Sequence, residues 1–261
     1  YIDISTGDFW VTEFTGSAAE EKLLNELNRI SPAECLVKPK GDFPTLWGDK
    51  FEKQQNTLIS YIDEEVELAA NDLWPDSLCS EDLLAKGYTC GIKALQAIIF
   101  YLHKTQKSGF KHIKKVISYD TDFYLEMDNA TQRNLELTAT IRDGKREGSL
   151  LGVIDHCQTA MGKRLLRQFI EQPLRDIEKI NARLDGIEEL VSDLVMRTRL
   201  QECLAKVYDM ERLAGKIGSE QAKPRDLIAL KLSIMLAQEI KEVLQGASSS
   251  ILQQLARADL L

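Results

Sequence analysis

The sequence has few of the residues from which metal sites and nucleophilic catalytic centres are built. Its three histidines, at positions 103, 112 and 156, are scattered along the chain. Its five cysteines stand at positions 35, 79, 90, 157 and 203, and no two of them form a CxxC pair. Such wide spacing and an odd number argue against both a zinc site and a disulfide framework. Free thiols are typical of a reducing compartment, so we expect a cytoplasmic protein.

Long apolar runs and phosphate-binding loops are also missing. The most apolar stretch, residues 97–102, is six residues long, far short of the roughly 20 residues that a transmembrane helix needs. We therefore expect no contact with a membrane. The nearest approach to a phosphate-binding loop is Gly162-Lys163, but Arg164 follows it and Cys157 occupies the place of the earlier glycine. A nucleotide site of this kind is thus not expected.

The excess of negative charge is confined to the first part of the chain. Residues 1–110 carry 18 acidic and 10 basic side chains, whereas residues 111–261 carry 23 of each, so the net charge of −8 lies entirely in the first 110 residues. A surface of this sign repels phosphate backbones. The chain begins at Tyr1 with neither an initiator methionine nor a signal peptide, and we expect it to be a piece of a longer protein.

The residue pattern changes at about the same place. Short β-forming runs surround Ser5-Thr6-Gly7-Asp8, a helix is expected after a capping box at residues 17–20, and residues 35–37 form a short apolar run. We expect one helix near residues 55–70, and the apolar spacing predicts another over residues 89–106. Strands that alternate with helices indicate an α/β domain.

Beyond residue 120 the pattern is helical. Asp128 or Asn129 is suited to cap a helix that runs to Leu137. We expect another helix over residues 160–172, ended by Pro173, with an apolar face made by Met161, Leu165, Leu166, Phe169 and Ile170. Asp176 caps the next helix, and Pro224 begins a long one at its first position. These amphipathic segments with short connections predict an all-α bundle.

Carboxylates at the start of the chain raise one catalytic alternative. Carboxylates are the side chains that hold the metal ions of a metal-dependent nuclease. The candidates here are Asp3 in the first strand, Asp8 after the turn, and the run Asp63-Glu64-Glu65. Such a centre requires the carboxylates to converge around both ions. We expect Asp8 to lie in a turn and residues 63–67 to form a solvated helix face. The pattern therefore favours solvated carboxylates over a nuclease.

Two groups of charged residues are candidates for contacts with partners. Lys163, Arg164 and Arg167 form a basic patch on the expected 160–172 helix, and such side chains contact DNA phosphates. Asp63, Glu64, Glu65 and Glu67 concentrate negative charge in one run, which is suited to dock a basic partner surface. In both cases the alternative is a solvated face without a binding role.

One long stretch carries a more specific pattern. It contains Asp128-x-Ala130-Thr131-x-Arg133-Asn134-Leu135-Glu136-Leu137, then Gly148-Ser149-Leu150-Leu151, and then Thr159-Ala160-Met161-Gly162-x-Arg164-Leu165-Leu166. This stretch resembles the opening of the core domain in the bacterial MutS mismatch-repair family, and the resemblance continues through residues 180–191 and 208–230. Upstream, residues 1–14 and 23–36 resemble the connector domain of that family.

The resemblance implies a layout and a role. It implies an RNase H-like connector domain, a mixed sheet flanked by helices and truncated at its N-terminus, over residues 1–107. A linker over residues 108–120 and the first part of the helical core and lever domain over residues 121–261 would follow. The chain would couple mismatch recognition to the ATPase and offer a docking surface to MutL. The alternative is a metal-dependent RNase H-like nuclease.

The resemblance also implies which functions lie outside the chain. Full-length members of the family bind mismatched double-stranded DNA, form homodimers, and use ATP and magnesium, whereas we expect no cofactor, metal or catalytic residue in this chain itself. We therefore expect the chain not to be an enzyme on its own.

Overall fold

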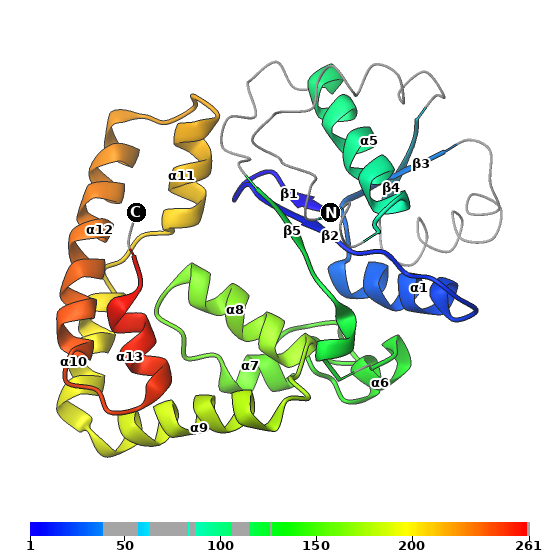
Figure 1. The fold of residues 1–261 in the computed structure, drawn as a ribbon. Coiled ribbons are helices and arrows are strands. Elements are labelled where there is room, and N and C mark those ends of the chain that lie inside the picture. Colours follow the sequence, from blue (N-terminus) through cyan, green and yellow to red (C-terminus); the bar gives the residue numbers. More distant parts are fainter. Residues whose placement is uncertain (39–56, 63–82, 84–86, 106–114, 126, 260–261) are drawn as a thin grey trace. The chain divides into compact units, whose positions relative to one another are not determined.

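The computed structural model describes residues 1–38, 57–62, 83, 87–105, 115–125 and 127–259 (Figure 1). They form two compact units, Tyr1–Asp120 and Thr121–Leu261. The first unit contains the described strands and two long helices, and the second consists of helices joined by short loops. The chain is therefore a mixed α/β protein with small sheets and mostly helices, which confirms the expected fold class at this level.

The first sheet of unit 1 has three strands in the order β1 (Ile2–Asp3), β2 (Asp8–Val11) and β5 (Val116–Ser118). β1 is antiparallel to β2, and β5 is parallel to it. The β1–β2 turn is possible because Gly7 adopts a φ of 83°, in a region that favours glycine. Phe9 and Val11 are buried against the helix α5 (Cys90–Thr105), which places the main core of this unit between β2 and α5.

The second sheet of unit 1 is a parallel pair, β3 (Glu34–Val37) and β4 (Leu58–Tyr61). Val37 and Ile59 pack against Leu24 and Leu27 of the helix α1 (Ala19–Ile30). The expected helix near residues 55–70 is wrong where the structure describes that range, because residues 58–61 form β4. The run Leu58-Ile59-Ser60-Tyr61 is rich in strand formers, and its hydrogen bonds to β3 decide the conformation.

Polar contacts between distant residues hold unit 1 together. The Glu13 carboxylate accepts hydrogen bonds from the backbone N–H groups of Thr89 and Gly91, both at 2.9 Å, and so caps the N-terminus of α5. The Glu34 carboxylate accepts hydrogen bonds from the hydroxyls of Ser60 and Tyr101, each at 2.5 Å. Glu34 thus attaches α5 to β3, and Glu13 attaches it to the segment that follows β2, in each case through residues that lie 67 to 78 positions apart.

The predicted linker over residues 108–120 contains a strand. Val116–Ser118 pair with residues 9–11 of β2, so this part of the segment belongs to the sheet of unit 1. Val, Ile and Ser in an extended segment next to a buried strand explain the pairing. Residues 108–114 lie outside the described residues.

Unit 2 is built from helices, most of which begin at a side-chain cap. The helices are α6 (Asn129–Asn134), α7 (Leu150–Ile154), α8 (Ala160–Glu171), α9 (Ile177–Ser192), α10 (Leu194–Leu204), α11 (Met210–Gly218), α12 (Pro224–Leu244) and α13 (Ser250–Arg257). Asp128 and Asp176 cap α6 and α9, and Pro224 is the first residue of α12, as the sequence predicts. Asp, Ser and Thr at these positions satisfy N–H groups that a helix leaves unpaired.

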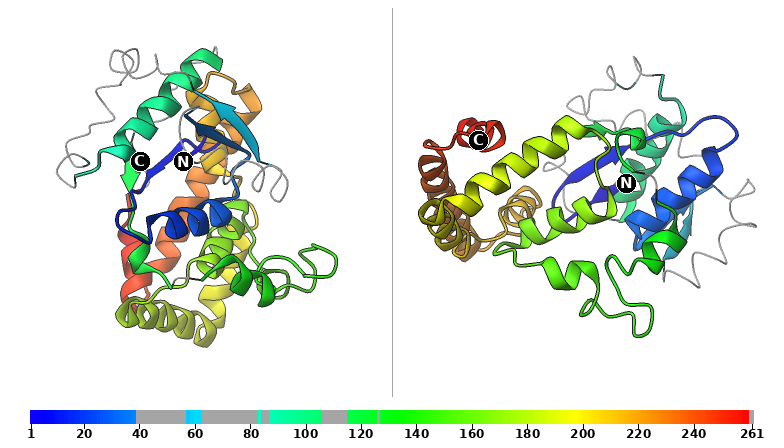
Figure 2. Two further views of the ribbon diagram at one scale, coloured as in Figure 1. Left: turned by 90° about the vertical axis from the view of Figure 1, so that its right-hand side faces the viewer. Right: turned by 90° about the horizontal axis from the view of Figure 1, so that it is seen from below.

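Two apolar clusters hold the helices of unit 2 together. Leu200, Leu244, Ala247 and Leu252 form one cluster, in which α12 packs against α10 and α13 (Figure 1). The other, smaller cluster contains Leu137, Leu151 and Ile170 and joins α7 to α8. Figure 2 shows the loop between α6 and α7 extending away from these helices.

One expectation for unit 2 is wrong, and another is wrong in part. The helix that was expected to run from Asp128 to Leu137 ends at Asn134, because Glu136 takes a left-handed conformation with φ of 47°. The apolar face expected on α8 is a core only in part, because Ile170 is buried in the smaller cluster whereas other members of the face are exposed. Leu166 is half-buried against the smaller cluster, whereas Leu165 and Phe169 are 48% and 36% exposed.

Candidate functional site

The backbone of unit 2 is tightly constrained at Gly148-Ser149-Leu150-Leu151-Gly152. Gly148 has a φ of 93°, and the fully buried Ser149 donates a hydrogen bond to the carbonyl of Arg146 and accepts one from the N–H of Gly152. A Cβ atom on Gly152 would lie 2.2 Å from the carbonyl oxygen of Arg146. The motif that carries the resemblance thus performs a structural task. It returns the chain from the α6–α7 loop into α7 with no room for a side chain.

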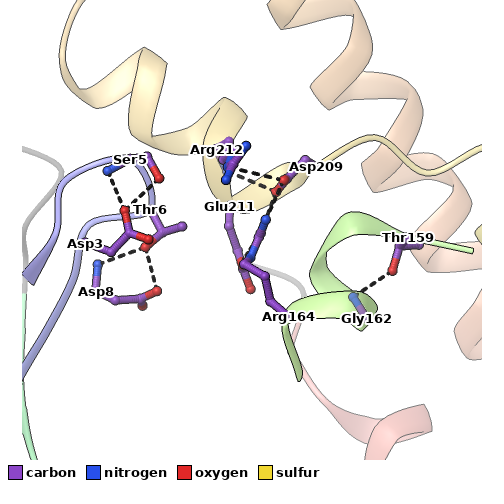
Figure 3. Close-up of polar contacts among 10 residues, drawn as sticks. All are labelled: Asp3, Ser5, Thr6, Asp8, Thr159, Gly162, Arg164, Asp209, Glu211 and Arg212. Carbon is purple, nitrogen blue, oxygen red and sulfur yellow. Dashed lines mark hydrogen bonds and ion pairs between the residues drawn. The ribbon is translucent and has the colours of Figure 1, made fainter. Parts of the chain in front are cut away.

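A charged joint connects α8 to the start of α11. The guanidinium of Arg164 donates two hydrogen bonds to the carboxylate of Asp209, both at 2.8 Å, and also pairs with Glu211 (Figure 3). The same Asp209 carboxylate caps α11 by accepting a hydrogen bond from the N–H of Arg212. We call Arg164 and Asp209 the Arg164–Asp209 joint. It fixes the first turn of α11 against α8 across 45 residues of sequence.

The electrostatics of this joint follow from its geometry. The hydrogen-bonded Arg164 guanidinium lowers the pKa of the Asp209 carboxyl. The Asp209 carboxylate in turn raises the pKa of Arg164. A bidentate pair of this kind specifies orientation as well as attraction, because two parallel hydrogen bonds allow only one arrangement of the planes.

The three predicted phosphate-contact residues lie in different surroundings. Arg164 is engaged in the joint, and Arg167 pairs with Glu171 on the same helix at 2.8 Å. Lys163 is exposed on the same helix. The contact of these residues with DNA phosphates stays a prediction. Any such contact by Arg164 has to compete with two carboxylates that already hold it.

The candidate nuclease carboxylates at the start of the chain serve the local turn. Asp3 accepts hydrogen bonds from the N–H and the hydroxyl of Ser5, and Asp8 accepts one from the hydroxyl of Thr6 (Figure 3). The acidic run Asp63, Glu64, Glu65 and Glu67 lies outside the described residues. Over the described ranges no three histidine, cysteine or acidic side chains are placed to hold a metal ion.

The start of α8 does not fit a nucleotide phosphate. The N–H of Gly162, which a phosphate-binding loop would direct at its ligand, donates instead to the hydroxyl of Thr159 at 2.9 Å (Figure 3). Thr159 is therefore the cap of α8, and the residues around Gly162-Lys163 do not form a cradle for ATP. None of the helices in the described ranges combines the length and apolar character that a membrane span needs.

Three contacts that sequence patterns did not indicate fix the remaining helices. The Glu189 carboxylate of α9 accepts hydrogen bonds from the backbone N–H groups of Ser248 and Ser249 and so caps α13. The hydroxyl of Ser233, fully buried in α12, accepts a hydrogen bond from the N–H of Tyr208. Gly186 allows α9 and α13 to approach closely, because a Cβ atom there would lie 2.6 Å from the Ile251 side chain. The two residues of each contact lie 25 to 65 positions apart in the sequence, so no local sequence pattern predicts these contacts.

Comparison with known proteins gives matches that follow the two units. A family model described as MutS domain II matches residues 1–114, and one described as MutS domain III matches residues 130–261. The DNA mismatch repair protein MutS of Syntrophomonas wolfei is 47% identical over 268 aligned residues, which cover 100% of this chain and 31% of that protein.

Other relatives show the same coverage. The DNA mismatch repair protein MutS of Alkaliphilus oremlandii is 39% identical, with 98% of this chain and 30% of that protein aligned. That of Halothermothrix orenii is 38% identical, with 98% of this chain and 29% of that protein aligned. The chain thus spans less than a third of the length of these relatives, and the matches lend no support to the nuclease alternative.

Proposed function

Because the chain belongs to the MutS family of DNA mismatch-repair proteins, we propose that it serves mismatch repair by coupling mismatch recognition to the ATPase. The observation that carries this proposal is the order of the two matches. MutS domain II coincides with unit 1 and MutS domain III with unit 2, and they follow one another along the chain. In this role the chain transmits a change of conformation and performs no chemistry itself.

The contacts within unit 2 support a mechanical role. The Arg164–Asp209 joint, the Glu189 cap of α13 and the Ser233–Tyr208 hydrogen bond each attach the end of one helix to another helix. Helices that are fixed at such points move as a body rather than separately, and displacement at one end is delivered at the other. Most of these contacts use charged or buried polar groups, which are costly to leave unpaired.

For unit 1 we propose an RNase H-like arrangement. Its support is the mixed pairing, with an antiparallel β1–β2 hairpin, a parallel β2–β5 pair, and helices beside the strands. An antiparallel hairpin beside parallel strands is what such an arrangement requires. Asp3 and Asp8 then have the structural task of closing the first turn.

The proposed partners belong to the whole protein. We propose that it binds mismatched double-stranded DNA, forms a homodimer, uses ATP and magnesium outside this chain, and acts in the cytoplasm. We further propose that unit 1 offers its acidic surface, with Asp63, Glu64, Glu65 and Glu67, to a basic face of MutL. Lys163, Arg164 and Arg167 are the proposed phosphate contacts of unit 2.

A chimeric protein tests the coupling role. The segment of Syntrophomonas wolfei MutS that aligns with this chain is replaced by the chain, and the chimera is expressed in bacteria that lack MutS. We expect the mutation rate to fall toward that of cells with the parent protein. The purified chimera should also change its ATP turnover when a G·T duplex replaces a matched duplex. A soluble, expressed chimera that leaves both readouts at the level of the empty vector would disprove the proposal.

A charge reversal tests the docking of MutL. In the same chimera, Asp63, Glu64 and Glu65 are changed to Lys, and association with MutL is followed at about 0.05 and 0.3 M salt. Complementary charges mainly raise association rates and are screened by salt. We expect slower association at low salt and little change in dissociation. Equal association rates for both proteins at both salt concentrations would leave these residues as a solvated surface.

A further inference from the structure

Arg183 of α9 is a half-buried cation without an anionic partner among the described residues. Its guanidinium carbon lies 3.7 Å from the centre of the Phe169 ring. Two other arginines of unit 2 are buried to a similar degree, and both have polar partners. Arg164 pairs with Asp209 and Glu211, and Arg197 donates hydrogen bonds to the carbonyls of Leu190 and Val191.

A second cation–aromatic pair lies one helical turn earlier on α9. The ammonium group of Lys179 lies 5.3 Å from the centre of the Phe123 ring, and its carboxylate contact with Asp176 is long, at 3.9 Å. Lys179 and Arg183 are four residues apart and therefore lie on the same side of the helix. The two aromatic rings are placed along this side by different segments, Phe123 from the start of unit 2 and Phe169 from α8.

The surroundings of these pairs are apolar and exposed. Phe123 and Leu125 are 58% and 52% exposed, and Phe169 is 36% exposed. The chain is held here by a bridge between Tyr124 and Leu174 and by the hydrogen bond from the N–H of Leu125 to the carbonyl of Pro173. Phe123 ends the short 3-10 turn Thr121–Phe123, and Leu125 follows it two residues later, with both side chains largely exposed. We call Phe123, Leu125, Phe169, Lys179 and Arg183 the cation–aromatic face.

From these contacts we propose that the cation–aromatic face binds a segment of a partner protein in which a carboxylate stands next to apolar side chains. A guanidinium stacked on an aromatic ring keeps its N–H edge free, and that edge matches a carboxylate bidentately. The exposed rings supply the apolar contact, and the ring stacking fixes Arg183 before the partner arrives.

The charges of the face favour an acidic protein segment over a nucleic acid. The face offers two cations, Lys179 and Arg183, whereas duplex binding typically neutralises roughly 6–10 phosphates. Two cations next to exposed apolar side chains are suited to one or two carboxylates on an apolar segment. This inference goes beyond the proposed coupling role and does not depend on it.

Binding of a labelled peptide tests the face directly. The probe is a short fluorescein-labelled peptide rich in Glu and Leu, its control is the same peptide with every Glu replaced by Gln, and both are titrated with the whole chain by anisotropy at about 0.15 M salt. We expect saturable binding of the Glu peptide only. Arg183→Gln should weaken it about tenfold, which corresponds to the loss of a charge-assisted hydrogen bond.

Two further variants keep the test decisive. Arg142→Gln removes the same charge from a side chain that is 92% exposed on the α6–α7 loop, and it should bind like the wild type. Lys179→Gln removes the more exposed cation and should also weaken binding, which covers the case in which Arg183→Gln fails to fold. The proposal is overturned if neither variant weakens binding, if the Gln peptide binds equally well, or if no binding occurs up to about 1 mM. Stronger Arg183-dependent binding of a DNA duplex would also overturn it.

Discussion

The carboxylate of Asp209 has two tasks, since it caps α11 and also accepts a hydrogen bond from each terminal nitrogen of the Arg164 guanidinium on α8. The side chains of Arg164 and Asp209 are 32% and 19% exposed, so the pair is shielded from water more than an ordinary surface ion pair. Surface pairs typically contribute between about 0 and 1 kcal/mol. A shielded, bidentate pair that also caps a helix is expected to contribute more.

Loss of Asp209 should therefore destabilise unit 2 measurably. Asp209→Ala removes a helix cap and leaves the fork of Arg164 without its main acceptor, and we expect a loss of about 1–3 kcal/mol. Urea unfolding monitored by circular dichroism measures it. The matched control is Asp143→Ala, which breaks the exposed 4.0 Å pair with Arg142 and should cost under about 0.5 kcal/mol. Similar losses for the two variants would show that the joint is no stronger than a surface pair.

The buried hydroxyl of Ser233 gives a second prediction. Ser233→Ala removes a fully buried hydroxyl that accepts a hydrogen bond from the N–H of Tyr208 at 3.0 Å. The net contribution of such a hydrogen bond is about 0.5–1.5 kcal/mol, and we expect a loss of stability in that range. Ser192→Ala is the control, because its hydroxyl is exposed and bonds only to the carbonyl of Glu188 within the same helix. If both variants unfold at the same urea concentration as the wild type, Ser233 does not fix the α11–α12 region.

Helix starts could be predicted from the sequence where a capping residue or proline lies next to the first turn. Asp176 caps α9 and Pro224 begins α12, and in both cases the signal lies within three residues of the helix. The capping box expected at residues 17–20 did not form, because α1 begins at Ala19 after Ala18, without a side-chain cap. The packing of Leu24 and Leu27 against the second sheet is sufficient to hold α1 in place.

The joints between helices could not be predicted in the same way. Arg164 was predicted to belong to a basic patch because Asp209, the carboxylate that pairs with it, lies 45 residues away in the sequence. Phe169 was predicted to be a core residue because its apolar neighbours share its helical face. In the structure the Arg183 guanidinium lies over its ring. Strand β4 was taken for part of a helix because its pairing with β3 is not visible in a four-residue run. In each case a contact distant in sequence decided the outcome.

Gly152 gives a third prediction, with a matched glycine in the same unit. Gly152→Ala would place its Cβ atom against the backbone carbonyl of Arg146 at 2.2 Å, and a backbone atom cannot move aside as a side chain does. We expect a loss of about 1–3 kcal/mol from overpacking. Gly246→Ala is the control, since no atom lies within 4 Å of its added Cβ. A Gly152→Ala protein as stable as the Gly246→Ala protein would contradict the close packing of the motif.

The last prediction concerns acid stability and Glu189. The pKa of this carboxyl is lowered to about 2 by the hydroxyl and N–H groups of Ser249 and Ser248. In the unfolded chain a glutamate has a pKa of about 4.3. A carboxyl with a depressed folded pKa stabilises the protein above the unfolded pKa, and this contribution is lost as the pH falls toward the folded value. Glu189→Gln should therefore be less stable than the wild type at pH 7, and the difference should shrink between about pH 4.3 and 2.

Urea unfolding of both proteins at a series of pH values from about 7 to 3 follows this difference across the window. The matched control is Glu188→Gln, which removes an exposed carboxylate from the neighbouring position of α9 and should leave the stability at pH 7 nearly unchanged. Protonation of Glu189 removes the negative charge that faces the N-terminus of α13, so the acid-treated wild type should come to resemble the variant. A stability difference that stays constant over the whole pH range would mean that Glu189 does not act through its charge as the cap of α13.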